Sequence, residues 1–148
     1  VSVEMVEAVG HAYYGEYFAT CARLLVPGGL AAIQAITIQD RFYEQARREV
    51  DFIKRYIFPG SCIPAVSILT QAARPTPLRL VHLEDTTPHY AETLRHWRER
   101  FMANWESIRA QGFSEEFGRL WQFYFAYCEG GFRGGGINVA QVTLVKSV

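Results

Sequence analysis

Residues 25–38 read Leu-Val-Pro-Gly-Gly-Leu-Ala-Ala-Ile-Gln-Ala-Ile-Thr-Ile, and this stretch decides the fold. The triplet Pro27-Gly28-Gly29 is a strong stop signal for any helix that precedes it. The run that follows, residues 30–38, is almost continuously apolar and rich in Ala and Ile. Such a run is typical of a strand that is buried on both faces, as in a parallel sheet.

The residues before this stretch complete a β-α-β unit. Residues 1–5 predict a short strand, and residues 11–25 carry an apolar stripe at helical spacing. The crossover should be right-handed and the two strands parallel. The chain begins without Met, and nothing in it covers the outer edge of the first strand. We therefore expect it to be a piece of a longer protein whose upstream half is absent.

The same periodicities extend the prediction to the rest of the chain. The remaining elements are predicted as helices over 41–56 and 63–73, a strand over 78–83, a helix that begins at Thr87-Pro88 and ends at Gly112, a helix that begins at Ser114, a loop over 130–136 and a strand over 139–145. The order β-α-β-α-α-β-α-α-β predicts an α/β layer fold.

Composition and charge exclude several classes of protein. Apolar residues make up 49% of the 148 residues, and fifteen basic residues balance fifteen acidic ones, which argues against a nucleic-acid partner. Three widely spaced cysteines fit neither a zinc site nor a disulfide framework, so a reducing compartment suits the chain best. No apolar stretch reaches the roughly 18 residues of a membrane-spanning helix.

Two positions qualify as a site because ligands of open α/β sheets bind outside the carboxyl ends of the strands. Glu7 follows the first predicted strand, and Gln34 and Ile36 lie toward the end of the second. A buried Gln needs hydrogen-bond partners. The ordinary interpretations are an acid at a helix N-terminus for Glu7 and a satisfied core amide for Gln34. Position alone leaves these alternatives open.

Other polar and aromatic residues carry weaker signals. The four histidines show no metal-ligand spacing, and His11 suits a capping or packing role. Aromatic residues make up 14% of the chain; they suit a core, or the lining of a site for an apolar chain or a cation. Arg133-Gly134-Gly135-Gly136 does not follow a strand and open a helix, so it predicts a flexible loop, not a phosphate cradle.

Two segments are more specific than any periodicity: Tyr56-Ile57-Phe58-Pro59-Gly60 and His89-Tyr90-Ala91-Glu92-Thr93-Leu94. Five further segments accompany them: 2–11 (SVEMVEAVGH), 25–29 with 34–37 (LVPGG, QAIT), 52–64 (FIKRYIFPGSCIP), Gly112-Phe113, and 127–132 (YCEGGF) with Gln141. They are distributed from residue 2 to residue 141, so the resemblance that they carry covers essentially the whole chain. They resemble the cyclopropane-fatty-acyl-phospholipid synthases and the related mycolic acid cyclopropane synthases.

The resemblance implies a class I S-adenosylmethionine-dependent methyltransferase fold, which is Rossmann-like α/β. Residues 1–148 would form the C-terminal portion of the catalytic domain. Their four strands would be the family's fourth to seventh, in the order 4-5-7-6 with an antiparallel last strand. The Gly-rich cofactor loop and the acidic ribose contact would lie in the absent N-terminal half. The resemblance thus assigns no cofactor-binding residue to this fragment, and it implies no metal.

The resemblance also implies a reaction: methylene transfer from S-adenosylmethionine to a cis double bond of a phospholipid acyl chain, with a bound bicarbonate ion as base. Glu7, Gln34 and Tyr90 align with three bicarbonate-binding positions, and Ile36 aligns with a backbone contact. Some members have His where this chain has Gln34. Because Glu7 and bicarbonate are both anions, we expect Glu7 to accept a hydrogen bond from the bicarbonate hydroxyl. The Tyr90 hydroxyl and the Gln34 amide would donate to the carboxylate oxygens of the bicarbonate. A protonated Glu7 is the alternative.

Substrate and partner expectations complete the prediction. From their residue type and position, Tyr56 and Phe58 are expected to offer aromatic faces to the carbocation formed on the substrate. From the resemblance, the enzyme should act in the cytoplasm at the inner face of the membrane. The chain itself shows no basic amphipathic helix for docking. Two alternatives remain: a methyltransferase of a small soluble acceptor, or a non-catalytic half-domain that pairs through its open strand edge, for example as a homodimer.

Overall fold

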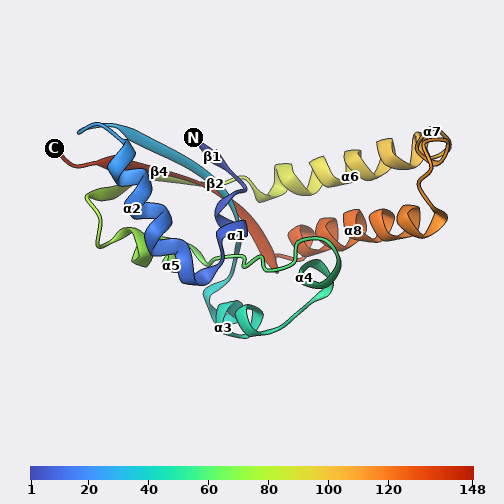
Figure 1. Ribbon diagram of the computed structural model, residues 1–148, viewed down its shortest axis with the longest axis horizontal. Helices are drawn as coiled ribbons and strands as arrows, with labels where there is room; N and C mark the ends of the chain where they lie inside the picture. The colour runs from blue at the N-terminus through green and yellow to red at the C-terminus, as the bar shows by residue number, and fades with distance from the viewer. The chain divides into compact units, whose positions relative to one another are not determined.

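The computed structural model describes residues 1–148, which form two compact units. The first unit comprises Val1–Thr86 and Ile137–Val148, and the second comprises Thr87–Gly136. Figure 1 shows the elements of each unit. The mixed α/β architecture confirms the predicted fold class.

The first unit is built on a four-stranded sheet in the order β1-β2-β4-β3. The strands are β1 (Ser2–Val3), β2 (Leu30–Ile38), β3 (Leu78–Asp85) and β4 (Ile137–Lys146). β1 is parallel to β2, as predicted, whereas β4 is antiparallel to both β2 and β3. The last strand of the chain therefore lies between the second and the third.

The turn before β2 depends on its glycines. Helix α2 (Tyr14–Leu24) ends there, and Gly28 adopts a φ of +74°. A Cβ on Gly29 would lie 2.8 Å from the carbonyl oxygen of Val26. Gly28 and Gly29 also exchange backbone hydrogen bonds of 2.9 Å with Lys146 at the end of β4. The stop signal in the sequence thus fixes both the end of α2 and the start of the central strand.

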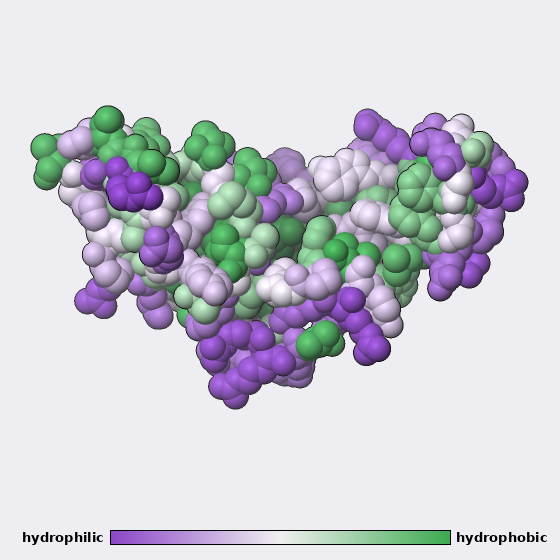
Figure 2. All heavy atoms as spheres, viewed as in Figure 1, coloured by the Kyte–Doolittle hydropathy of each residue, from purple (hydrophilic) through white to green (hydrophobic).

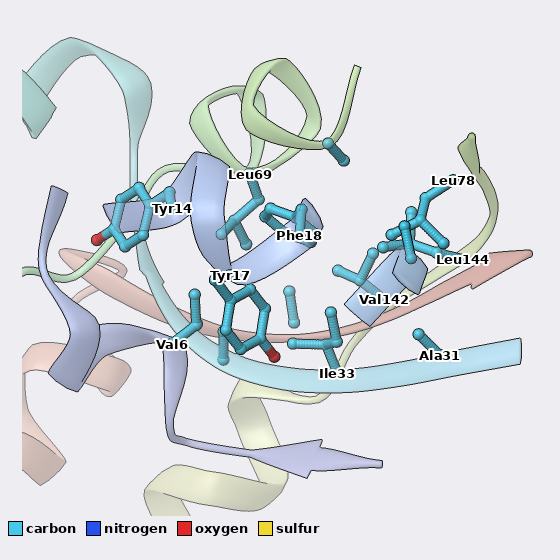
Figure 3. Close-up of a cluster of buried hydrophobic side chains, with 14 residues drawn as sticks. Val6, Tyr14, Tyr17, Phe18, Ala31, Ile33, Leu69, Leu78, Val142 and Leu144 are labelled. Carbon is cyan, nitrogen blue, oxygen red and sulfur yellow. The ribbon is translucent and has the colours of Figure 1, made fainter. Parts of the chain in front are cut away.

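The core of this unit lies on one face of the sheet. Helices α2 and α5 (Val66–Ala73) cover this face (Figure 3). The buried residues of the cluster are Val6, Tyr14, Tyr17, Phe18, Ala22, Ala31, Ile33, Ala35, Leu69, Ala73, Leu78, Ala140, Val142 and Leu144. The prediction that β2 is buried on both faces is wrong for this chain: Leu30 is 61% exposed, and Ala32 is also exposed. The cause is that α2 and α5 lie on one face only.

The predicted helix over 41–56 is two helices, α3 (Asp40–Arg48) and α4 (Phe52–Tyr56). Glu49 takes an extended conformation, and the Asp51 carboxylate accepts a hydrogen bond from the Lys54 N–H at 2.9 Å. Asp51 therefore caps a new helix instead of continuing the old one. Hydrophilic side chains gather over α3 in Figure 2.

The second unit is a helical hairpin. Its helices are α6 (Thr87–Ala103), α7 (Trp105–Arg109) and α8 (Glu115–Arg133), and α6 and α8 lie side by side (Figure 1). Ser114 caps α8, as predicted, by accepting from the Phe117 N–H at 3.2 Å. Aromatic rings fill the hairpin; Phe101, for example, lies 5.8 Å from Trp105 and 5.6 Å from Phe125 between ring centroids.

Two predicted boundaries in this unit are wrong. The helix that begins at Thr87 breaks at Asn104, whose side-chain amide donates to the Arg100 carbonyl at 2.8 Å and closes α6. The loop predicted over 130–136 begins only after Arg133, since α8 continues through Gly130 and Gly131. Burial of Phe132, which is 4% exposed, outweighs the cost of about 1 kcal/mol for each helical glycine.

Gly118 gives a stability prediction for this unit. A Cβ at this position would lie 2.5 Å from the Trp105 ring, so Gly118→Ala should lower the free energy of unfolding by about 1–3 kcal/mol. Gly130 lies in the same helix with nothing within 4 Å of an added Cβ. Gly130→Ala should therefore stabilise the protein by about 0.5–1 kcal/mol. Chemical denaturation of both variants checks the sign, and equal effects would contradict the packing of Trp105 on Gly118.

Candidate functional site

The site begins where β1 ends. Backbone pairing between β1 and β2 stops at Gln34, whose carbonyl accepts the Glu4 N–H at 2.9 Å. The next N–H on that edge of β2 belongs to Ile36, because alternate residues of a strand point to the same edge. Its partner is a side chain: the Ile36 N–H donates to Glu7 Oε1 at 2.6 Å. Glu7 therefore lies at the carboxyl end of the parallel strands, as predicted.

Two hydrogen bonds hold the backbone around Glu7. Glu7 lies in the short helix α1 (Val6–Val9), and its carbonyl accepts the Cys62 N–H at 2.9 Å. The Tyr14 hydroxyl of α2 in turn donates to the Cys62 carbonyl at 2.5 Å. Burial raises the pKa of Tyr14, so this donor keeps its proton at every physiological pH. Glu7 is thus fixed between β2, α2 and the segment around Cys62.

The Glu7 carboxylate is buried but only half satisfied. Glu7 is 8% exposed, and its Oε2 atom has no hydrogen-bond partner. Burial raises the pKa of Glu7 above its ordinary value, and the negative charge of Glu4 adds to this; the N–H groups of Glu7 and Ile36 act in the opposite direction. A buried carboxylate oxygen without a donor is costly. A ligand that donates a hydrogen bond to Oε2, or a proton on the Glu7 carboxyl, would therefore stabilise this arrangement.

Gln34 is held by two side chains on the sheet face opposite the core. Its Nε2 donates to Glu4 Oε1 at 3.0 Å, and its Oε1 accepts from Gln141 Nε2 at 2.9 Å. Gln34 is half-buried, and Gln141 lies directly opposite it on β4. Gln34 therefore has two side-chain partners, but it is not the core amide of the ordinary interpretation, because it lies outside the core cluster. One N–H of the amide remains for a ligand.

Tyr90 lies in the second unit, in the first turn of α6, as predicted. Its ring centroid lies 5.0 Å from that of Phe132 and 6.2 Å from that of Trp97, both in edge-on contacts. The structure therefore brings Glu7, Gln34 and Ile36 together in one unit and fixes the Tyr90 ring in the other. Whether Tyr90 joins them stays a prediction.

Tyr56 and Phe58 lie at the end of α4 in the first unit, and they are 57% and 52% exposed. The Arg55 guanidinium lies 5.5 Å from the centroid of the Tyr56 ring, so one cation already occupies an aromatic face there. Their proposed contact with substrate stays a prediction.

A cavity of about 310 Å³ lies beside the site, lined by residues that include His11, Arg47, Lys54 and Cys62. Its cations already have partners: Arg47 pairs with Glu44 at 2.8 Å, and the Lys54 ammonium donates to the carbonyls of Ala46 and Glu49.

No helix in the chain has the length and hydropathy needed to span a bilayer.

Sequence reasoning missed Glu4 and Tyr14 as parts of this site. Glu4 stands inside the segment predicted as a strand, yet its φ is +51°, which turns the chain out of the strand. Tyr14 appeared only as one member of an apolar stripe. No local pattern could have shown that its hydroxyl reaches Cys62, which lies 48 positions away.

Comparisons with known proteins identify the family of the chain. The sequence model of the family described as mycolic acid cyclopropane synthetase matches residues 1–142. The tuberculostearic acid methyltransferase of Mycobacterium tuberculosis is 46% identical over 99% of this chain and 34% of its own length. The cyclopropane-fatty-acyl-phospholipid synthase of Escherichia coli is 35% identical over 100% of this chain and 37% of its own length.

Solved structures of this family share the fold of the chain. A cyclopropane synthase from Mycobacterium tuberculosis superposes with a TM-score of 0.86 at 29% identity, over 97% of this chain and 53% of its own. A mycolic acid cyclopropane synthase complexed with SAH and CTAB superposes with a TM-score of 0.85 and the same coverage. The chain thus spans about a third to a half of the relatives that it matches. It belongs to the mycolic acid cyclopropane synthetase family.

Proposed function

We propose that the chain supplies the C-terminal half of the catalytic domain of an S-adenosylmethionine-dependent enzyme. The full-length enzyme would add a methylene carbon to a cis double bond of a phospholipid acyl chain. The observation that carries the proposal is the half-satisfied carboxylate of Glu7, held at the carboxyl end of the strands. The names of the relatives, which are lipid methyltransferases and cyclopropane synthases, support the lipid substrate.

The residues of the site suit a bicarbonate ion. Glu7 Oε2 lacks a donor, and a bicarbonate hydroxyl can donate to it when Glu7 is ionised. The second N–H of the Gln34 amide can donate to a carboxylate oxygen of the same ion. The Ile36 N–H already donates to Glu7 Oε1 at 2.6 Å, so this N–H would hold the carboxylate and not the ion. The backbone contact of Ile36 with the ion stays a prediction. Bound there, bicarbonate would supply the base for the proton that the methyl group loses.

Each residue of the site then has a limited task. Glu7 orients an acidic hydroxyl by accepting its hydrogen bond, and its burial keeps water from competing. Gln34 donates without changing its charge, because an amide does not titrate. The Tyr90 hydroxyl would donate as well, near the positive end of α6. These groups stabilise negative charge at a fixed place without becoming bonded to the substrate.

S-adenosylmethionine would supply the carbon, as its methyl group. The alkene would form a bond to that carbon as the bond between the carbon and the sulfonium sulfur breaks, and S-adenosylhomocysteine would leave. The base would then take one methyl proton, and the electron pair of that C–H bond would close the ring. We place the cofactor site mainly in the N-terminal half and the enzyme in the cytoplasm, in peripheral contact with the inner face of the membrane. Phospholipid docking would then use surfaces outside this fragment.

The test uses the full-length protein with S-adenosylmethionine and vesicles of phospholipid whose acyl chains carry one cis double bond. We expect release of S-adenosylhomocysteine and appearance of a cyclopropane acyl chain. Vesicles of the saturated phospholipid are the control and should give neither. Equal turnover of a small amine or hydroxyl acceptor in place of the lipid would instead support the alternative of a small-molecule methyltransferase.

A second measurement tests the division of labour between the halves. The 148-residue chain alone should bind no S-adenosylmethionine in a calorimetric titration, whereas the full-length protein should bind it. Binding to the fragment would mean that these residues build a cofactor site of their own.

Size determination of the fragment tests the remaining alternative, pairing through the edge of β1, where Val3 is 59% exposed.

A further inference from the structure

Glu4 has an unusual backbone conformation for its residue type. Its φ of +51° lies in the left-handed region, where a side chain with a Cβ is disfavoured, and it is the one non-glycine residue of the chain there. Its N–H still pairs with the Gln34 carbonyl at 2.9 Å. The conformation therefore ends β1 and directs the chain into α1, which carries Glu7.

The Glu4 side chain also determines how Gln34 is oriented. An amide can present either its oxygen or its nitrogen to a neighbour. Glu4 Oε1 can only accept when ionised, and it takes the Gln34 Nε2 hydrogen at 3.0 Å. The Gln34 oxygen then faces Gln141 Nε2 at 2.9 Å. The Glu4 carboxylate, the Gln34 amide and the Gln141 amide thus form a chain of two hydrogen bonds that favours one orientation of the Gln34 amide. In this orientation the second N–H of Gln34 Nε2 is available to a ligand.

Glu4 is also the charged neighbour of Glu7 within the first unit. The titratable groups that act on Glu7 or feel its charge are Glu4 on the turn between β1 and α1, and Tyr14 and Tyr17 on α2. Burial raises the pKa of both tyrosines, so they stay neutral. Cys62 contacts Glu7 through its backbone N–H. The carboxylate of Glu4 is therefore the like charge that opposes ionisation of Glu7.

We propose that Glu4 is a positioning residue of this site, which holds the Gln34 amide in one orientation and keeps a negative charge beside the Glu7 carboxyl. This inference rests on the proposed function only where turnover is the readout. Two consequences follow from the geometry. Loss of the carboxylate should weaken ligand orientation, and it should make Glu7 ionise at lower pH.

The test compares Glu4→Gln with Glu4→Asp in the full-length enzyme, using turnover as a function of pH. Glu4→Gln keeps the size but lets the Gln34 amide turn, so the plateau rate should fall roughly three- to tenfold. Its acidic limb should move to lower pH because the like charge is gone. Glu4→Asp keeps the charge but shortens the reach, so its rate should fall while its acidic limb stays in place. Glu16→Gln, an exposed carboxylate of α2, should change neither.

A second readout needs no turnover: the melting temperature as a function of pH. Because the folded-state pKa of Glu7 is raised, the native state gains stability from its proton at low pH and loses it as pH rises through that pKa. This loss should be smaller in Glu4→Gln and absent in Glu7→Gln. If wild type makes no product but the melting profiles differ in this way, the proposed function fails and the role of Glu4 stands. Superimposable pH profiles of wild type and Glu4→Gln in both measurements would overturn the role of Glu4.

Discussion

Glu7→Gln in the full-length enzyme is expected to lower turnover by on the order of 100-fold. Gln offers an oxygen to the Ile36 N–H, so the local fold should persist. However, Gln places an NH₂ group at the position from which Glu7 Oε2 would accept the hydrogen bond of the bicarbonate hydroxyl. It also cannot carry the negative charge that would orient that hydroxyl. The loss should therefore fall on the chemical step and not on folding. Activity of the variant against the unsaturated phospholipid measures it.

The stability of the same variant separates this role from a structural one. Burial of a half-satisfied carboxylate destabilises the ionised native state, and this is why the pKa of Glu7 is raised. Removing the charge should leave the melting temperature at neutral pH unchanged or higher. In wild type, turnover should decline as pH falls through the raised pKa of Glu7, above the range of an ordinary carboxyl. A variant that loses activity and stability together would point to a structural Glu7.

Tyr90→Phe is expected to lower turnover by at least about tenfold, because it removes one hydroxyl donor from the proposed anion site. The ring itself should stay in place, since its edge-on contacts with Phe132 and Trp97 do not use the oxygen. Steady-state turnover with the unsaturated phospholipid measures the loss of activity. The melting temperature shows whether the packing of the ring persists.

Tyr127→Phe is the matched control for this variant. Tyr127 lies on α8 in the same unit and is 43% exposed. Its loss of a hydroxyl should leave turnover within about twofold of wild type. If Tyr90→Phe also retains the wild-type rate, Tyr90 does not contribute a hydrogen bond to the reaction.

The central strand and the glycine turn before it were readable from sequence because their signals are local. β2 has the bounds that its apolar run predicts, and Ser114 caps α8 as its position before two glutamates indicates. The breaks at Glu49 and Asn104 were missed because one capping side chain decided each of them. Helical periodicity continues across both breaks, so a pattern of apolar residues does not show them.

The site was only partly predictable. Glu7, Gln34 and Ile36 follow from the rule that ligands bind at the carboxyl ends of strands. The structure joins Glu7 to Ile36 by a hydrogen bond and Gln34 to Glu4 by another. The sequence could not show which side-chain atoms have hydrogen-bond partners or how the Gln34 amide is oriented. The orphaned Oε2 of Glu7 depends on where β1 stops, and the orientation of Gln34 depends on Glu4 and on Gln141, which is 107 positions away.

The most direct test of the account uses S-adenosylmethionine with a trideuterated methyl group and the full-length protein, with mass spectrometry of the acyl product. We expect a cyclopropane chain that retains two of the three deuterons, because one leaves with the base when the ring closes. Retention of all three deuterons, on the acyl chain as a methyl branch or on another acceptor, would contradict the claim that this site removes a methyl proton.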